Sequence, residues 1–210
     1  MVTLRPQDEG PVAIALAVAT IVQRGGLAIF PTDTVYGIGC DPTWERSVER
    51  IFEAKGRPRS KPLSLHFASV VELLEYAAGN ELADRAASAF LPGPLTLIVR
   101  RPSKVAEFVT GGLETLGLRA PKHALCQTIL RYCGPIAATS ANHSGEPAYA
   151  GTGAVTELPP ADVFVDDGPT PVGAESTIID VSGKRARLVR EGAIKIAMLE
   201  DVLGPIGRPG

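Results

Sequence analysis

Strand-type and helix-type segments alternate along almost the whole sequence, and this alternation limits the possible folds more than any other feature. Pro11 precedes an apolar run that stops at Gly25-Gly26, which predicts a first helix over 12–22. A short buried strand is predicted directly after it, at 27–30. Because each type of element has an apolar face that the other must cover, the alternation predicts a layered α/β fold.

The same pattern continues to the C-terminal end. The segment from Asp41 to Lys55 is predicted to be a second helix, and a capping box formed by Ser69 and Glu72 precedes a third. The other predicted elements are strands at 63–67, 95–100, 116–120, 136–139, 163–165, 176–181 and 187–190, and helices at 124–132 and 194–202. Consecutive strands near the end predict antiparallel pairs, so we expect a twisted sheet of mixed parallel and antiparallel strands flanked by helices.

Composition narrows the class of protein. The chain of 210 residues contains 45% hydrophobic and 21% charged residues, without an internal repeat or a linker-like segment. These values are typical of a soluble globular protein, and we expect one domain over 1–210 with its core at about 10–200. No apolar run approaches the roughly 18–20 residues that cross a bilayer, and the N-terminus does not have the form of a secretion signal. A cytoplasmic location without membrane contact is therefore expected.

Cysteine and histidine residues show no metal-binding spacing. The three cysteines form no CxxC motif, and the three histidines are scattered. Cys126 and Cys133 lie seven residues apart on a predicted helix, where a pair of buried small apolar side chains is the favoured interpretation. We therefore expect no metal held by the protein itself.

Four cations lie within seven residues, in the stretch KGRPRSK at 55–61. Since the net charge is −2, this is a local feature and not part of a broad basic face. In a solvated loop, neighbouring cations about 7 Å apart would repel by only about 0.6 kcal/mol. In a cleft of effective dielectric ~20, the repulsion rises to roughly 2 kcal/mol per pair, and the cluster would need an anion such as a triphosphate. The sequence has no GxxxxGK[ST] or GxGxxG motif, so side-chain cations would have to bind the phosphates.

Polar side chains follow several of the predicted apolar strands. Thr32, Asp33 and Thr34 follow the first strand, where a polar turn capped by Asp33 is an equal alternative. Ser140 and Asn142 follow another, and a nucleophilic role for Ser140 is disfavoured because no GxSxG elbow surrounds it. Comparable polar residues stand at other strand ends, namely Arg119, Glu175, Ser176 and Arg190. Together they predict one crevice built from many segments.

Seven blocks in this order, PTDTVYG, KGRPRSKPLSLH, LPGPLT, GLRAP, TSAN, ESTIID and VREGAI, closely resemble the YrdC family of threonylcarbamoyl-AMP synthases. The resemblance covers roughly positions 10 to 200, and implies a twisted mixed α/β sheet with a concave, positively lined cavity. It also implies a nucleotidyltransferase that condenses L-threonine, bicarbonate and ATP, with Mg²⁺ carried by ATP, into threonylcarbamoyl-adenylate and pyrophosphate. A separate tRNA threonylcarbamoyl transferase complex would then modify the adenosine 3′ of the anticodon in tRNAs that read ANN codons.

The resemblance also implies the site residues. The nucleotide side would contain Lys55, Arg57, Lys61, Thr115, Ser140, Asn142, Tyr149 and Arg190. The threonine side would contain Thr32, His66, Arg119 and Ser176. Lys55 and Arg57 are expected to be the catalytic cations, whereas Arg59 matches no family position and is expected to be solvated.

The chain resembles the short members of the family and is expected to lack the C-terminal domain of the longer ones. Two alternatives stay open at this point. One is an RNA-binding module that uses the basic cleft on tRNA or rRNA, although direct tRNA contact is expected to be weak. The other is a related carbamoyl-transfer enzyme that acts on a different amine.

Overall fold

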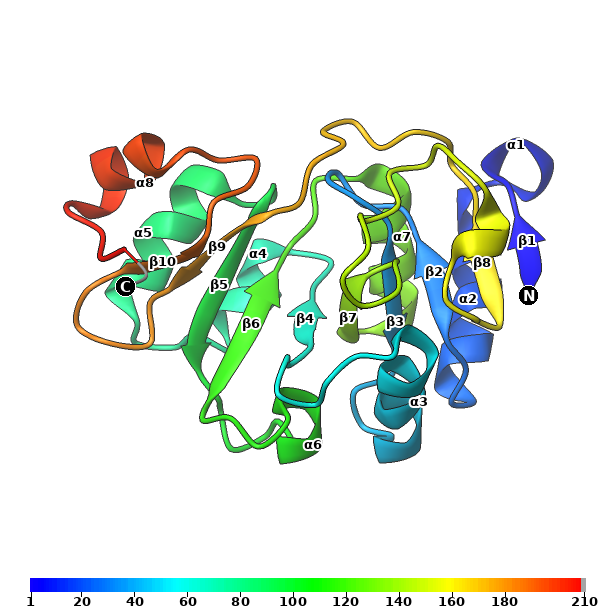
Figure 1. Cartoon of the computed structure of the whole chain (residues 1–210), viewed down its shortest axis with the longest axis horizontal. Helices are drawn as coiled ribbons and strands as arrows, with labels where there is room; N and C mark the ends of the chain where they lie inside the picture. Colours follow the sequence, from blue (N-terminus) through cyan, green and yellow to red (C-terminus); the bar gives the residue numbers. More distant parts are fainter. Residues whose placement is uncertain (209–210) are drawn as a thin grey trace.

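The computed structural model describes residues 1–208, and within them ten strands form one sheet in the order β1-β8-β2-β3-β7-β4-β6-β5-β9-β10 (Figure 1). The strands are β1 Val2–Leu4, β2 Ala28–Phe30, β3 Gly37–Cys40, β4 Ser64–His66, β5 Leu95–Arg100, β6 Thr115–Arg119, β7 Ile136–Ser140, β8 Val163–Val165, β9 Thr177–Asp180 and β10 Arg187–Arg190. The helices are α1 Pro6–Glu9, α2 Pro11–Gln23, α3 Glu45–Lys55, α4 Val70–Leu74, α5 Glu81–Phe90, α6 Glu107–Thr110, α7 Ala124–Cys133 and α8 Ile196–Leu203, with a 3₁₀ turn at Val155–Glu157.

The mixed strand direction predicted from the sequence is confirmed. The pairs β1–β8, β2–β8, β4–β6 and β5–β9 are parallel. The pairs β2–β3, β3–β7, β4–β7, β5–β6 and β9–β10 are antiparallel, and the last of these is the pair that the consecutive C-terminal strands predicted.

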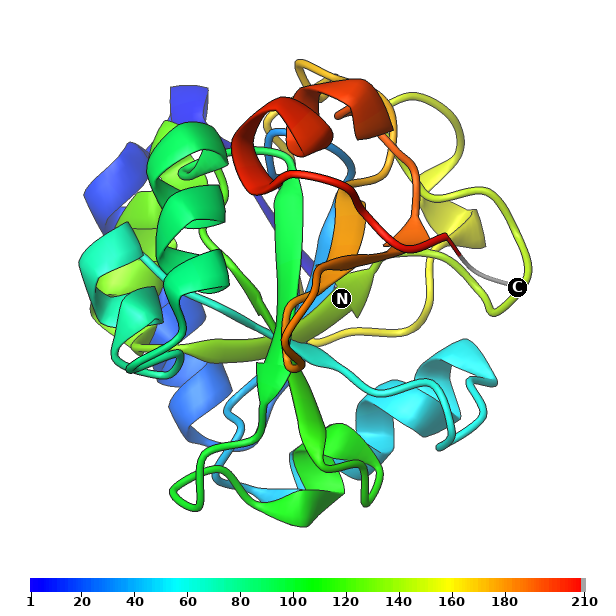
Figure 2. The same ribbon diagram turned by 90° about the vertical axis from the view of Figure 1, so that its left-hand side faces the viewer.

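Helices α2 and α7 cover one face of one half of the sheet. Ile14, Val18 and Val22, spaced four residues apart on α2, are buried against Leu125 and Ile129 of α7. Burial of each such side chain contributes about 1.5–3 kcal/mol, which is enough to fix the helices to the strands. Figure 2 shows the sheet nearly edge-on, with blue and green helices on one side and the cyan α3 on the other.

Helix α3 begins later than predicted and ends where predicted. It starts at Glu45 because the Asp41 carboxylate accepts hydrogen bonds from the backbone and hydroxyl of Thr43, which forms a separate turn first. It ends at Gly56, whose left-handed conformation (φ 59°) favours glycine. The chain therefore reverses direction directly after Lys55 and enters the cation-rich loop.

Several elements were not predicted from the sequence, namely β1, α1, β3, α5 and α6. Strand β3 contains Gly37 and Gly39, which are poor strand formers. Glycine is needed there because a Cβ on Gly39 would lie 2.5 Å from Ile136 Cγ2 in the neighbouring strand. The close packing of β3 against β7 therefore requires glycines, and because glycine has a low strand propensity, the sequence pattern does not predict this strand.

Alternation along β4 and β6 leaves one face of the central sheet polar. Leu65 and Leu118 point to the core shared with α5, whereas Ser64, His66 and Arg119 are lining residues of a cleft. No helix within residues 1–208 is long and apolar enough to cross a membrane.

Candidate functional site

A cleft of about 730 Å³ lies over the polar face of the central strands, and its volume is within the usual range of ligand sites. Among the described residues, eleven of the twelve predicted site residues line it: Thr32, Lys55, Arg57, Lys61, His66, Thr115, Arg119, Ser140, Asn142, Ser176 and Arg190. The twelfth, Tyr149, packs its ring against Tyr36 at 5.1 Å and Phe164 at 6.2 Å, so it supports the wall from behind.

Lys55 is buried in the structure and holds the loop after β7. Only 1% of its surface is exposed. Its Nζ donates to the backbone carbonyl of Ser140 at 2.5 Å, to the carbonyl of Asn142, and to Asn142 Oδ1 at 3.2 Å. Burial, together with the nearby Arg57 cation, lowers the pKa of Lys55 to about 7, and the Glu175 carboxylate opposes this shift. All three ammonium protons thus have acceptors within the protein.

Asn142 ties the same loop together from its other side. Its Nδ2 donates to the carbonyls of His143 at 2.9 Å and Glu146 at 2.7 Å. Its Oδ1 accepts from Ser140 Oγ at 2.6 Å. Because the Ser140 hydroxyl donates to the Asn142 amide oxygen and, in the described structure, makes no hydrogen bond to a lysine, histidine or carboxylate, the geometry supports a structural or binding role for it and not a nucleophilic one.

The cation-rich loop separates into residues that line the cleft and one that does not. Arg57 Nε donates to the carbonyl of Lys61 at 2.9 Å and Nη2 donates to Pro62 O at 3.1 Å. The guanidinium therefore holds the two ends of the loop together. Burial and the nearby Arg190 cation lower the pKa of Arg57. Arg59 lies outside the lining set and pairs with Glu49 at 3.0 Å on the surface, as its predicted solvation implies.

Arg190 approaches the cleft from the last strand. Its Nε and Nη2 donate to the Ser176 carbonyl at 3.2 and 2.9 Å, and Nη1 lies 2.8 Å from Glu175 Oε1. The Ser176 hydroxyl lies 2.9 Å from Thr96 Oγ1, inside the sheet. These contacts fix the position of the guanidinium plane at the rim of the cleft.

Arg119 forms a buried cluster at the opposite side. Its Nη2 lies 2.6 Å from Asp33 Oδ1 and 2.6 Å from Thr34 Oγ1, and both charged residues are about nineteen-twentieths buried. Thr32 Oγ1 donates to Val35 O at 2.6 Å, which folds the turn that presents Asp33. Asp33 Oδ2 and Arg119 Nε are buried without a hydrogen-bond partner in the described structure.

His66 lies in the same part of the cleft. Its Nε2 is 3.3 Å from Ser64 Oγ, while its Nδ1 is buried without a partner in the described structure. Burial lowers the pKa of His66 to about 3, and the Arg119 cation contributes to the shift. The side chain is therefore a neutral imidazole at physiological pH, able to donate or accept one hydrogen bond to a ligand.

Sequence reasoning placed some residues near the site without predicting their contacts. Asp33 was a candidate at the end of a strand, with a capping turn residue as the alternative, but its ion pair with Arg119 was not predicted. Glu175 was grouped with the other strand-end residues of the crevice, but its ion pair with Arg190 was not predicted. Leu113 and Val189 are exposed apolar residues at the cleft rim, which no motif identified.

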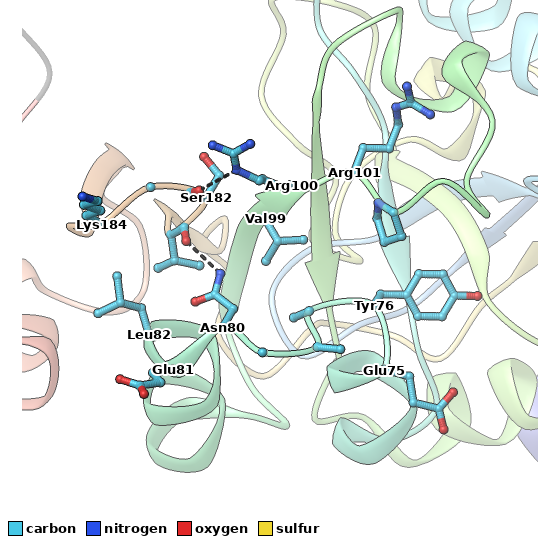
Figure 3. A pocket seen from close by; sticks show the side chains of 16 residues that line it. Glu75, Tyr76, Asn80, Glu81, Leu82, Val99, Arg100, Arg101, Ser182 and Lys184 are labelled. Atoms are coloured by element: carbon cyan, nitrogen blue, oxygen red, sulfur yellow. Dashed lines mark hydrogen bonds between the residues drawn. The ribbon is translucent and has the colours of Figure 1, made fainter.

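A second concavity, of about 590 Å³, lies between the α4–α5 turn and the ends of β5 and β9 (Figure 3). It carries charges of both signs, from Arg100 and Lys184 and from Glu75 and Glu81, and none of the twelve predicted residues is in its lining among residues 1–208. The first cleft is therefore the candidate functional site. Within the same residues, no group of three or more His, Cys, Asp or Glu side chains is arranged to hold a metal ion.

Solved structures share this fold. Sua5 from Pyrococcus abyssi in complex with L-threonine superposes with a TM-score of 0.88 at 36% identity, covering 99% of this chain and 62% of that one. YciO from E. coli superposes with a TM-score of 0.80 at 23% identity, over 93% of this chain and 96% of the other. The second likeness shows the fold alone.

Proteins with similar sequences are named as threonylcarbamoyl-AMP synthases. The chain is 40% identical to threonylcarbamoyl-AMP synthase of Pyrococcus abyssi and 38% identical to that of Bacillus subtilis, each over 193 residues, or 90% of this chain and 56% of the relative. It thus spans little more than half the length of these two proteins. A putative threonylcarbamoyl-AMP synthase of Mycobacterium leprae is 35% identical over 95% of this chain and 91% of its own length. Residues 20–192 match the Sua5/YciO/YrdC family model, described as "Telomere recombination", and the chain therefore belongs to this family.

Proposed function

We propose that the protein is an L-threonylcarbamoyladenylate synthase, a nucleotidyltransferase that forms threonylcarbamoyl-AMP and pyrophosphate from L-threonine, bicarbonate and ATP. The observation that carries the proposal is the cleft, in which eleven residues from seven separate segments meet. Its cations divide into one group from the 55–61 loop and β10 and another at Arg119, which fits a triphosphate and an amino-acid carboxylate bound side by side. The names of the relatives support the same reaction.

The roles follow from the contacts. Arg57, Lys61 and Arg190 would bind the phosphates, because their cationic groups line the cleft beside the loop that Lys55 and Asn142 hold. Lys55 acts mainly by fixing that loop and by adding positive charge, since its three protons already have acceptors. Arg119 and the neutral His66 would bind the threonine carboxylate at the other side, with Ser176 and Thr32 next to them.

The chemistry requires positioning and charge stabilisation more than covalent help from the protein. An oxygen of the N-carboxylated threonine attacks the α-phosphorus of ATP, a new oxygen–phosphorus bond forms, and the bond to the pyrophosphate oxygen breaks. Holding the reactants together can supply several kcal/mol of the barrier. The fixed cations stabilise the negative charge that moves onto pyrophosphate, assisted by the Mg²⁺ that enters with ATP.

The wider setting is also part of the proposal. The single sheet supports one YrdC-like domain over residues 1–210, with its core at about 10–200. The adenylate would pass to a tRNA threonylcarbamoyl transferase complex in the cytoplasm, with at most weak direct contact to tRNA. An acyl adenylate is reactive toward water, so a short path to its consumer would protect it.

The test is pyrophosphate release by the purified protein, with ATP, Mg²⁺, bicarbonate and L-threonine each omitted in turn. We expect release that requires all of them and falls when serine replaces threonine, together with a product of the mass of threonylcarbamoyl-AMP. Release with another amine would identify a related carbamoyl-transfer enzyme. Absence of release in every mixture, with salt-sensitive RNA binding, would contradict the proposal and favour the RNA-binding module.

A further inference from the structure

Positively charged side chains outnumber negatively charged ones in the lining of the cleft. Among the described residues, the charged lining residues are Lys55, Arg57, Lys61, Arg119 and Arg190 on the positive side and Glu146 and Glu175 on the negative side. Glu175 is the acid of this set that forms an ion pair with a cleft cation, through Oε1 to Arg190 Nη1 at 2.8 Å. A carboxylate therefore already occupies part of the surface that a phosphate would use.

Arg190 does not depend on Glu175 for its position. Its Nε and Nη2 donate to the Ser176 carbonyl at 3.2 and 2.9 Å, and Nη2 also lies 3.4 Å from Ser176 Oγ. Ser176 is only 5% exposed, and its hydroxyl meets Thr96. If Glu175 moves away, these contacts keep the guanidinium in place with Nη1 free.

The Glu175 side chain can move while its backbone stays. The Glu175 carbonyl accepts from Ala193 N at 3.0 Å, and a Cβ on Gly192 would approach that carbonyl to 2.2 Å, so the backbone is closely enclosed. The side chain itself is 41% exposed. A change of rotamer is therefore enough to move the carboxylate from Arg190 into solvent.

A phosphate group can compete with the Glu175 carboxylate for Nη1 of Arg190. Carboxylate and phosphate oxygens bind the same guanidinium edge, and a phosphate carries more charge. Glu175 also faces the other cations, because its charge acts on Lys55 and Arg57 as well as on Arg190. Any polyanion that enters this side of the cleft meets both the occupied Arg190 and the repulsion of the Glu175 carboxylate.

We propose that Glu175 is a resident counter-ion of the phosphate subsite, displaced when a polyphosphate binds Arg190 and returning when the pyrophosphate leaves. This inference rests on the proposed function, because it concerns how the same cleft binds and releases phosphate. The carboxylate keeps Arg190 neutralised in the empty cleft and weakens binding of free pyrophosphate. Product release is thereby made easier without loss of the cation needed during reaction.

The experiment is calorimetric titration of inorganic pyrophosphate into wild-type protein, Glu175→Gln and the matched control Glu146→Gln, each with and without Mg²⁺. We expect Glu175→Gln to bind pyrophosphate about fivefold more tightly, because the ligand no longer has to break an ion pair. Glu146→Gln removes the other lining carboxylate and is expected to change the affinity by less than about twofold, since Glu146 has no ion pair in the described structure. Both variants should unfold at the wild-type temperature.

The outcomes separate this inference from the function on which it rests. Unchanged or weaker pyrophosphate binding by Glu175→Gln, in a wild-type protein that does bind it, would overturn the counter-ion role and indicate that Glu175 orients Arg190. Weaker binding only in the presence of Mg²⁺ would also overturn it, because it would identify Glu175 as a metal ligand. A wild-type protein that binds neither pyrophosphate nor ATP would overturn the proposed function and this inference with it.

Discussion

The ammonium group of Lys55 lies 3.2 Å from the side-chain oxygen of Asn142, although the two residues are 87 positions apart in the sequence. The bond joins the end of α3 to the loop after β7, and the same ammonium donates to the carbonyl of Ser140, the last residue of β7, and to that of Asn142 in the loop. The shape of the cleft floor therefore depends on a cation that solvent does not reach.

Lys55→Ala should lower both activity and stability. We expect turnover to fall at least tenfold, about 1.4 kcal/mol, because the loop and one positive charge are lost. Removal of the ammonium also leaves the part-buried Asn142 carbonyl without its donor, whereas the Ser140 carbonyl still accepts from Asn142 N at 3.1 Å, and such a loss costs about 1–3 kcal/mol of unfolding free energy. Steady-state pyrophosphate release and urea unfolding measure the two effects, with the exposed Lys122→Ala as control. Wild-type turnover in Lys55→Ala would contradict the assignment.

Arg57→Ala and Arg59→Ala form a matched pair from one loop. Arg57 lines the cleft, whereas Arg59 pairs with Glu49 on the surface. We expect Arg57→Ala to lose at least tenfold in turnover and Arg59→Ala to stay close to wild type, as measured by pyrophosphate release at saturating substrates. Equal effects of the two substitutions would show that the loop acts only through its net charge.

Asp33→Asn should be strongly destabilising although it preserves shape. The substitution leaves the Arg119 guanidinium buried without its counter-charge, and loss of one partner from a buried pair costs about 3–5 kcal/mol. The double variant Asp33→Asn with Arg119→Met should lose less than the sum of the two single effects. Urea unfolding of the three variants tests this, with Arg46→Ala as an exposed ion-pair control. A loss below about 1 kcal/mol in Asp33→Asn would contradict a tightly coupled pair.

Acid should destabilise the protein partly through His66. Burial holds the pKa of His66 at about 3, below its usual value of 6.5. Between these two values the unfolded chain binds one more proton at this residue than the folded protein, so the unfolding free energy falls as the pH falls through this window. The contribution approaches about 1.4 kcal/mol per pH unit.

Urea unfolding of wild-type protein and His66→Gln between pH 6.5 and 4.5 measures this contribution. The variant should show a shallower dependence of the unfolding free energy on pH than the wild-type protein. Identical slopes for wild type and His66→Gln would show that His66 already binds a proton in the folded state.

The sequence identified most of the sheet because its strands are apolar runs bounded by turns. The bounds of β5, β8 and β10 agree with the prediction at both ends. Strand β3 was not predicted because its glycines, which permit close packing against β7, have a low strand propensity. Helix α5 was not predicted, although its buried residues Ala83, Ala86 and Ala87 follow helical spacing and its N-cap Asn80 accepts from Ala83 N.

The site could be predicted only in part. The ordered family blocks contain ten of the eleven lining residues, all except Thr115, but spacing carries no information about which side chains meet after folding. The ion pair between Asp33 and Arg119 joins positions that are 86 residues apart in the sequence. Through it, a carboxylate outside the cleft lining balances the charge of one of the cleft cations. Likewise, the burial of Lys55 follows from the position of the C-terminal end of α3 beside Ser140 and Asn142 and not from the local KGR pattern. These are tertiary relationships, which a single sequence does not express locally.

The cleft takes side chains from the turn after β2 and from β10, which lie on opposite sides of the centre of the sheet. A ligand held by both sides links strands that have no direct contact with each other. Its binding energy is then added to the resistance of the whole sheet against unfolding, by about 2.7 kcal/mol at a ligand concentration one hundred times the dissociation constant. If ATP and threonine are the ligands, as proposed above, a cell rich in both would degrade the protein more slowly, so that its abundance would follow the supply of its ligands without a separate regulator.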